Sequence, residues 1–206
     1  MVKNKKELDT YFDKELDSLK EQGLFRELRI LPEAGGKISV NGKKFLNFSS
    51  NDYLNLASHP HVKAAAIEAT AQMGCSATAS RLMSGHLELH EALEVVLARM
   101  MGSDAALVFG SGFLVNIGVL TSLAGRDDEI FADRLNHASL IDGMLMSGAK
   151  WHRYRHKNMD HLETLLKKSE PRGRRIIVSD SIFSMDGDIA PLKDLDELAG
   201  RYGAML

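Results

Sequence analysis

The sequence predicts an α/β fold with a mostly parallel sheet flanked by helices, preceded by an N-terminal helix and a β-hairpin arm. Two observations predict this fold. After about residue 105, short apolar stretches alternate with helical stretches, as they do in chains of βαβ units. Before that point the apolar residues follow helical spacing, and an Asn-Gly pair joins two strand-like stretches.

The N-terminal elements follow from local patterns. Residues 3–22 place apolar side chains three or four positions apart, which predicts an amphipathic helix. The stretches 37–40 and 43–48 predict a hairpin that turns at Asn41 and Gly42. Together they form an arm in front of the main sheet.

Helices and strands alternate through the remainder of the chain. Two helices are predicted over residues 61–73 and 87–101, with a loop of small residues between them. Strands are expected over residues 105–109, 129–132, 150–154 and 174–179. The intervening helices are expected over residues 114–123, 139–146, 159–168 and 192–201. The last residues begin a further strand, so we expect the natural domain to be incomplete in this chain.

Composition limits the classes of function. The 206 residues suit one domain with arms, and a net charge of −2 offers no basic surface to a nucleic acid. No apolar stretch reaches the roughly 20 residues of a membrane span. Cys75 is the only cysteine, which favours a reducing compartment, and we expect its side chain to be buried. We therefore expect a cytoplasmic protein without a membrane or nucleic-acid partner.

Three loops that follow predicted strands carry unusual chemistry, at residues 109–113, 133–139 and 180–188. Such loops lie together at the carboxyl edge of a parallel sheet, where ligands bind. They bring a glycine-rich segment, the imidazole of His137 and the hydroxyl of Ser184 to that edge. This combination suits a phosphorylated aromatic cofactor.

The glycine-rich segment has two interpretations. Gly110-Ser111-Gly112 opens a helix, so its backbone N–H groups can bind a phosphate, but the segment can equally be a tight turn that needs glycine. Phe113 can be the first core residue of that helix. A dinucleotide-binding motif is less favoured because the third glycine is missing.

The other polar residues also have structural alternatives. His137 can stack on a flat ring or bind a carboxylate, or it can be structural. Ser184 can reach a ring substituent, or it can form a turn ahead of residues 186–188, which we interpret as solvated. His86 and His90 share a helical face, but no third ligand accompanies them, so we expect no metal.

Three segments together resemble the α-oxoamine synthases, which are fold-type I enzymes that use pyridoxal 5′-phosphate (PLP). These segments are NFSSNDYL at residues 47–54, DRLNHASLIDG at 133–143 and FSMDGDIAPL at 183–192. The resemblance covers the chain from about Leu24 to its last residue. It implies the large domain of a PLP-dependent transferase.

The resemblance implies a role for each matching cofactor residue. The backbone of Gly112 and Phe113, beside Ser111, would hold the cofactor phosphate. His137 would stack on the pyridine ring, and Ser184 would hydrogen-bond the ring oxygen. These roles agree with the chemistry of the three loops.

Substrate residues are also implied. Arg26 would face a carboxylate of the acyl donor or the amino acid, since a guanidinium binds carboxylates through two bonds. Asn51 would line the same pocket from the facing protomer of a homodimer, and His137 would contact the substrate as well. Residues 1–58 would form the N-terminal helix, arm and hairpin, and residues 59–206 a truncated PLP-binding domain.

Within the family, the segments are nearest to the enzymes that condense L-alanine with a pimeloyl thioester, carried on coenzyme A or a carrier protein, in biotin biosynthesis. The family's Schiff-base lysine and pyridine-binding aspartate would follow residue 206, so we expect no catalytic residue here and an inactive fragment. Two alternatives stay open. One is another α-oxoamine synthase, such as glycine C-acetyltransferase, and the other is a non-catalytic remnant that binds a partner or dimerises.

Overall fold

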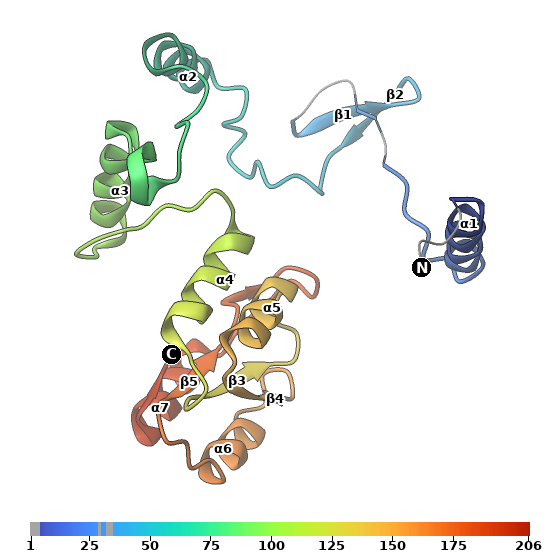
Figure 1. Cartoon of the computed structure of the whole chain (residues 1–206). Helices are drawn as coiled ribbons and strands as arrows, with labels where there is room; N and C mark the ends of the chain where they lie inside the picture. The colour runs from blue at the N-terminus through green and yellow to red at the C-terminus, as the bar shows by residue number, and fades with distance from the viewer. Residues whose placement is uncertain (1–4, 29, 32–34) are drawn as a thin grey trace. The chain divides into compact units, whose positions relative to one another are not determined.

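The computed structural model describes residues 5–28, 30–31 and 35–206. The chain divides into two compact units, residues 1–85 and 86–206 (Figure 1). The division into an arm and a cofactor domain after residue 58 stays a prediction.

The first unit begins with α1 (Lys5–Glu21) and the hairpin of β1 (Lys37–Val40) and β2 (Lys43–Leu46). The strands are antiparallel and pair Val40 with Lys43, as the Asn-Gly turn predicts. Both turn residues have positive φ, 51° at Asn41 and 75° at Gly42, which is the backbone of a type I′ turn. The hairpin prediction is therefore confirmed.

The first unit continues with α2 (Pro60–Met73) and a π-helical turn, η1 (Arg81–Gly85). Gly85 is the only buried residue among those described in this unit. The carbonyl of Ala79 lies so close to it that a Cβ would overlap this carbonyl, so the position requires glycine. Cys75 is exposed, so the prediction that it is buried is wrong. The loop of residues 74–80 has no buried residue, so the small side chain of Cys75 has no core to enter.

The second unit holds the main sheet. Its helices are α3 (Glu88–Met101), α4 (Gly112–Leu123), α5 (Ala138–Ser147), α6 (Met159–Lys167) and α7 (Leu192–Tyr202). Its strands are β3 (Glu129–Asp133), β4 (Lys150–Tyr154), β5 (Arg175–Val178), β6 (Ile182–Phe183), β7 (Asp188–Ile189) and β8 (Ala204–Met205). Four strands form a parallel sheet in the order β4-β3-β5-β8, while β6 and β7 form a small antiparallel hairpin.

Helices cover both faces of this sheet. Successive side chains of β3 point to opposite faces, and both faces are buried. Phe131 belongs to a buried cluster with side chains of α6 and α7, whereas its neighbour Ile130 belongs to a cluster with side chains of α4 and α5. Both side chains have 0% exposure. The predicted α/β fold with a parallel sheet between helices is confirmed.

One predicted strand is wrong. Residues 105–109 form no strand in the part of the chain that is described. The N–H of Val108 instead donates to Oε1 of Glu94, at 2.7 Å. An apolar stretch becomes a strand only when a neighbouring backbone pairs with it, and periodicity cannot report that neighbour. None of the described helices is long and apolar enough to cross a membrane.

Candidate functional site

A pocket lies at the carboxyl ends of β3 and β5, where the sequence predicts a ligand. Its volume is about 180 Å³. The lining residues come from two of the three loops and are Leu135, Asn136, His137, Ala138, Asp180, Phe183, Ser184, Met185 and Asp186. His137 and Ser184, which are 47 positions apart by their numbers, therefore share one pocket.

Asn136 and Asp180 connect the two loops. The buried Asn136 donates from Nδ2 to the carbonyl of Val178, at 2.8 Å, and its Oδ1 accepts the N–H of Asp180, at 3.1 Å. In return Oδ2 of Asp180 accepts the N–H of His137, at 2.7 Å. These bonds fix the backbone on both sides of the pocket, so His137 and Ser184 are carried on connected loops.

His137 is the N-cap residue of α5. Its Nδ1 accepts the N–H of Ser139, at 3.2 Å, and lies 2.7 Å from Oγ of the same residue. Oγ of Ser139 also accepts a hydrogen bond from Nδ2 of Asn116 on α4, at 2.8 Å. Ser139 has 0% exposure, whereas His137 is exposed. A buried residue therefore binds Nδ1 of the imidazole, while the rest of the ring stays accessible to a ligand.

The start of α4 carries the third predicted loop. Ser111 is the N-cap, and its Oγ accepts the N–H of Leu114, at 3.3 Å. No residue of the described chain bonds the N–H groups of Gly112 and Phe113, which point out of the first helical turn. A Cβ on Gly112 would meet nothing within 4 Å, so a ligand can approach the backbone there.

Contacts between α4 and α5 place their N-termini at the same end of the sheet. Asn116 contacts Ser139, and one turn later Leu120 packs against Gly143, so the two helices run parallel. Figure 1 shows them side by side. Gly112 lies one turn before Asn116 and therefore at the end of α4 nearer the His137 loop.

Ser184 lies on the exposed turn between β6 and β7. The N–H of Gly187 donates to the carbonyl of Phe183, at 2.7 Å, and Gly187 has φ of 70°, which favours glycine. The interpretation of residues 186–188 as a solvated turn is only partly right. Asp188 is half-buried and bonds to residues that follow β4.

Asp133, His156, Lys157 and Asp188 form what we term the His156 cluster. Nδ1 of His156 lies 3.0 Å from Oδ1 of Asp133, and its Nε2 lies 3.0 Å from Oδ2 of Asp188. Lys157 donates its N–H to Asp133, at 2.9 Å, and its Nζ to Asp188, at 3.0 Å. The cluster thus ties the end of β3 to the hairpin that carries Ser184.

The neighbouring charges and hydrogen bonds shift the pKa of His156 and of Asp188 in opposite directions. Burial disfavours the charged imidazole, but the carboxylates of Asp133 and Asp188 outweigh burial and raise the pKa of His156. Lys157, and then His156, lower the pKa of Asp188. A positively charged His156 between two carboxylates is the arrangement that these shifts favour.

The structure does not relate Arg26 or Asn51 to this pocket. Both residues are exposed, and both belong to the first compact unit, whereas the pocket belongs to the second. Beside Asn51, Oδ1 of Asp52 accepts the N–H groups of Leu56 and Ala57, at 2.8 and 3.2 Å, which gives the loop a defined shape. Their substrate roles stay predictions.

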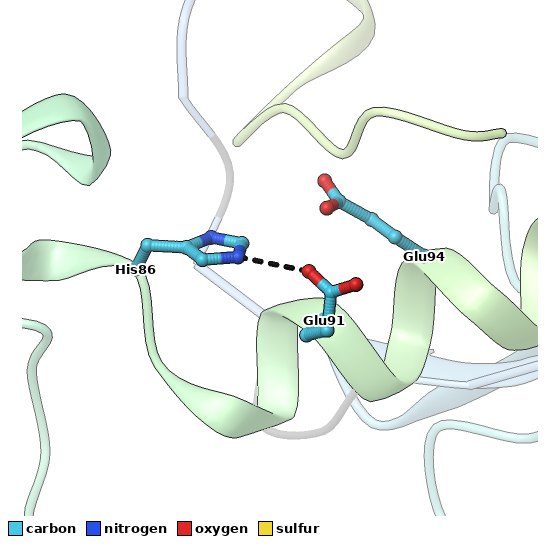
Figure 2. A group of neighbouring side chains, drawn as sticks. All are labelled: His86, Glu91 and Glu94. Carbon is cyan, nitrogen blue, oxygen red and sulfur yellow. Dashed lines mark hydrogen bonds and ion pairs between the residues drawn. The ribbon is translucent and has the colours of Figure 1, made fainter.

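His86 and His90 lie at the start of α3, where His90 bonds the backbone. Their rings stack at 5.8 Å, and Nδ1 of His90 accepts the N–H of Leu87 at the start of α3. His86 instead lies beside Glu91 and Glu94, with ligand atoms within 4.8 Å of one another (Figure 2). Nε2 of His86 is 3.1 Å from Oε2 of Glu91, and Oε1 of Glu94 accepts the N–H of Val108. These side chains therefore make hydrogen bonds within the protein.

A larger cavity, of about 360 Å³, lies between α4 and the β5–β8 edge. Its lining is apolar apart from Asn116 and Ser179, and it contains no titratable side chain. The smaller pocket differs from this cavity because its lining includes an imidazole, a hydroxyl and two carboxyl side chains, those of His137, Ser184, Asp180 and Asp186. The sequence did not predict a role for Asp180, which lines the pocket, or for Asn116 and Ser139, which support His137, although Ser139 and Asp180 lie inside the predicted loops.

Comparison with known proteins identifies the family of this chain. The model of the aminotransferase class I and II family matches residues 43–206. The chain belongs to this family. A member from Citrifermentans bemidjiense, an 8-amino-7-oxononanoate synthase, is 50% identical over 196 residues, which are 95% of this chain and 50% of that protein. The 8-amino-7-oxononanoate synthase of Geobacter sulfurreducens is 50% identical over 193 residues, with 93% and 49% covered.

Solved structures of other proteins also match this chain. Serine palmitoyltransferase from S. paucimobilis, with bound PLP and myriocin, aligns with a TM-score of 0.86 at 27% identity, over 98% of this chain and 52% of that chain. The 8-amino-7-oxononanoate synthase from Francisella tularensis aligns with a TM-score of 0.60 at 29% identity, over 73% and 41%. The chain thus spans about half the length of the curated relatives that it matches.

Proposed function

We propose that this chain is the cofactor-binding part of a PLP-dependent acyltransferase that makes 8-amino-7-oxononanoate. The complete enzyme condenses L-alanine with a pimeloyl thioester and releases CO2 and the free thiol, in biotin biosynthesis. The observation that carries the proposal is the single pocket that contains both His137 and Ser184. The 50% identity to synthases of that product supports this substrate choice over those of other α-oxoamine synthases.

The residues of the pocket fit PLP. The exposed imidazole of His137 offers a flat face to a pyridine ring, and the Ser184 hydroxyl can donate to the ring oxygen from the same pocket. The free N–H groups of Gly112 and Phe113 suit the phosphate at the start of α4. When bound, PLP supplies the electron sink that lets the amino acid lose its Cα proton.

The chain's own residues bind and orient in this proposal. Asn136 and Asp180 keep the two pocket loops together, so the His137 ring and the Ser184 hydroxyl stay at a fixed separation. Arg26 binds a substrate carboxylate, and Asn51 lines the pocket of the facing protomer in a homodimer. The Schiff-base lysine and the aspartate for the pyridine nitrogen lie outside the 206 residues.

Thiol release by the full-length protein tests the reaction. With pimeloyl-CoA as donor, we expect turnover with L-alanine and little with glycine or L-serine. Preference for glycine with acetyl-CoA would instead identify a different α-oxoamine synthase. A full-length protein without turnover, whose 206-residue part folds stably and binds a partner, would support the non-catalytic alternative.

Cofactor binding tests the pocket itself. In the full-length protein, Ser184→Ala should weaken PLP binding about tenfold, since it removes a hydrogen bond to a charged ring oxygen. Ser181→Ala is the matched control, because Ser181 is exposed and bonds Ala190 only through its carbonyl. Absorbance titration with PLP measures both. Equal affinity of the two variants would contradict the assigned role of Ser184.

A further inference from the structure

The ring of His137 has one nitrogen engaged by protein and one open. Nδ1 contacts two groups of Ser139, its backbone N–H at 3.2 Å and its Oγ at 2.7 Å. Nε2 has no hydrogen-bond partner among the described residues. The two nitrogens therefore have different environments, and the difference decides where the ring proton lies.

The backbone N–H of Ser139 settles the role of Nδ1. An N–H group can only donate, so Nδ1 must accept, and the proton of the neutral imidazole then lies on Nε2. A proton on Nδ1 would face the Ser139 N–H directly. The backbone of α5 therefore specifies one tautomer.

Asn116 strengthens the same choice from the next helix. Its Nδ2 lies 2.8 Å from Oγ of Ser139, and an amide nitrogen only donates. Oγ accepts that bond, which leaves the hydroxyl proton to point at Nδ1 of His137. Because Ser139 has 0% exposure, water does not compete for either bond.

We propose that Asn116 and Ser139 are positioning residues that fix His137 as the Nε2–H tautomer and set the plane of its ring. The backbone bond from His137 to Asp180, at 2.7 Å, completes the support. The role of this ring toward a bound ligand rests on the proposed function, whereas the tautomer does not. The Asn116 bond also links α4, whose first turn carries Gly112, to the His137 loop.

Histidine ¹⁵N NMR of the full-length protein at pH 8 tests the tautomer without relying on activity. We expect His137, assigned by comparison with His137→Gln, to show a protonated Nε2 and an unprotonated Nδ1. A proton on Nδ1 in the wild type would overturn the proposal, whatever the variants do.

Two variants test the positioning residues. Asn116→Asp replaces the donor by an acceptor, which draws the hydroxyl of Ser139 away from the ring, so the Nδ1 signal of His137 should shift while the proton stays on Nε2, where the backbone N–H of Ser139 keeps it. Ser139→Ala should broaden them and weaken PLP binding about fivefold, the effect of one lost hydrogen bond. Ser147→Ala is the control on the same helix, because its hydroxyl bonds the carbonyl of Met144.

The outcomes separate this inference from the proposed function. His137 signals in Asn116→Asp and Ser139→Ala that match the wild type would overturn the positioning role. The expected tautomer and variant effects, with no change on adding PLP, would support the positioning role and contradict the cofactor.

Discussion

The two ends of β3 both bury carboxylates, but they use different partners. At the amino end, Asp128 is held by backbone N–H groups and by Arg174, whose charge does not change with pH. At the carboxyl end, Asp133 is held by His156, whose charge does change with pH. The first arrangement stabilises the fold under all physiological conditions, whereas the second sits beside the pocket and responds to protonation.

The amino end is the more strongly bonded. Asp128 accepts the N–H of Gly125, at 2.9 Å, the N–H of Arg174, at 2.6 Å, and the Arg174 guanidinium, at 3.1 Å. Hydrogen bonds from Arg174 are the main reason that the pKa of Asp128 falls to about 2. Asp128 thereby joins the turn before β3 to the residue before β5.

The largest effect is expected from Asp128→Asn. It should lower the free energy of unfolding by about 2 kcal/mol at pH 7, the energy of a fall in pKa from 3.8 to about 2, as urea denaturation can measure. Because the folded-state pKa is lowered, the stabilisation is present above about pH 4 and disappears as the pH falls to about 2. Asp127→Asn, at an exposed neighbour, is the control. An equal loss in both variants would contradict the assignment of this stabilisation to the bonds that Asp128 accepts.

A packing change between α4 and α5 should disturb the support of the His137 loop. In Gly143→Ala the new Cβ would lie 2.9 Å from Cδ1 of Leu120 and 3.0 Å from the carbonyl of Asn116, which pushes α4 from α5. We expect a loss of about 1 to 2 kcal/mol in urea denaturation, together with weaker PLP binding.

Gly200→Ala is the matched change for that experiment. Its Cβ would meet nothing within 4 Å on α7, so it should stabilise by about 0.5 to 1 kcal/mol. Destabilisation by both alanines would show that the α4–α5 contact is not the cause.

His156→Gln should have a smaller and pH-dependent effect. The folded-state pKa of His156 is raised, so its stabilisation is fully present below about pH 6.5 and is lost as the pH rises through the raised value. We expect a loss of about 1 kcal/mol at pH 6 that narrows at pH 9, measured by urea denaturation at both values.

An exposed histidine of the other unit, tested as His61→Gln, is the control for His156. It should show no difference between the two pH values. A loss in the free energy of unfolding of His156→Gln that grows with pH would contradict a charged His156 between Asp133 and Asp188.

The smallest effect is expected from an ion pair away from both ends. The half-buried Glu163 on α6 contacts the exposed side chains of Arg201 and Lys167, at 2.8 and 3.3 Å. Glu163→Gln should leave the thermal midpoint unchanged, because solvent screens such pairs. A drop comparable to that of Asp128→Asn would mean that exposure does not distinguish the two networks.

Residues within one element were predictable from their neighbours in the chain. The Asn41-Gly42 turn and the mostly apolar run of residues 129–132 are local signals, so the hairpin and strand β3 were predicted. The strand over residues 105–109 was not, since pairing requires a partner that the apolar pattern does not reveal. The β6–β7 hairpin was missed because its strands have only two residues each.

The sequence by itself determined the α/β fold and that the loops of His137 and Ser184 would lie together, because strand–helix alternation forces loops after parallel strands to one edge. Only the tertiary structure decided how the site residues are held. Asn116 reaches Ser139 from another helix, 23 positions away in the sequence. His156 joins Asp133 to Asp188, which lie 23 positions before it and 32 positions after it. Such bonds depend on distances between elements, and those distances arise only when both faces of the sheet are packed.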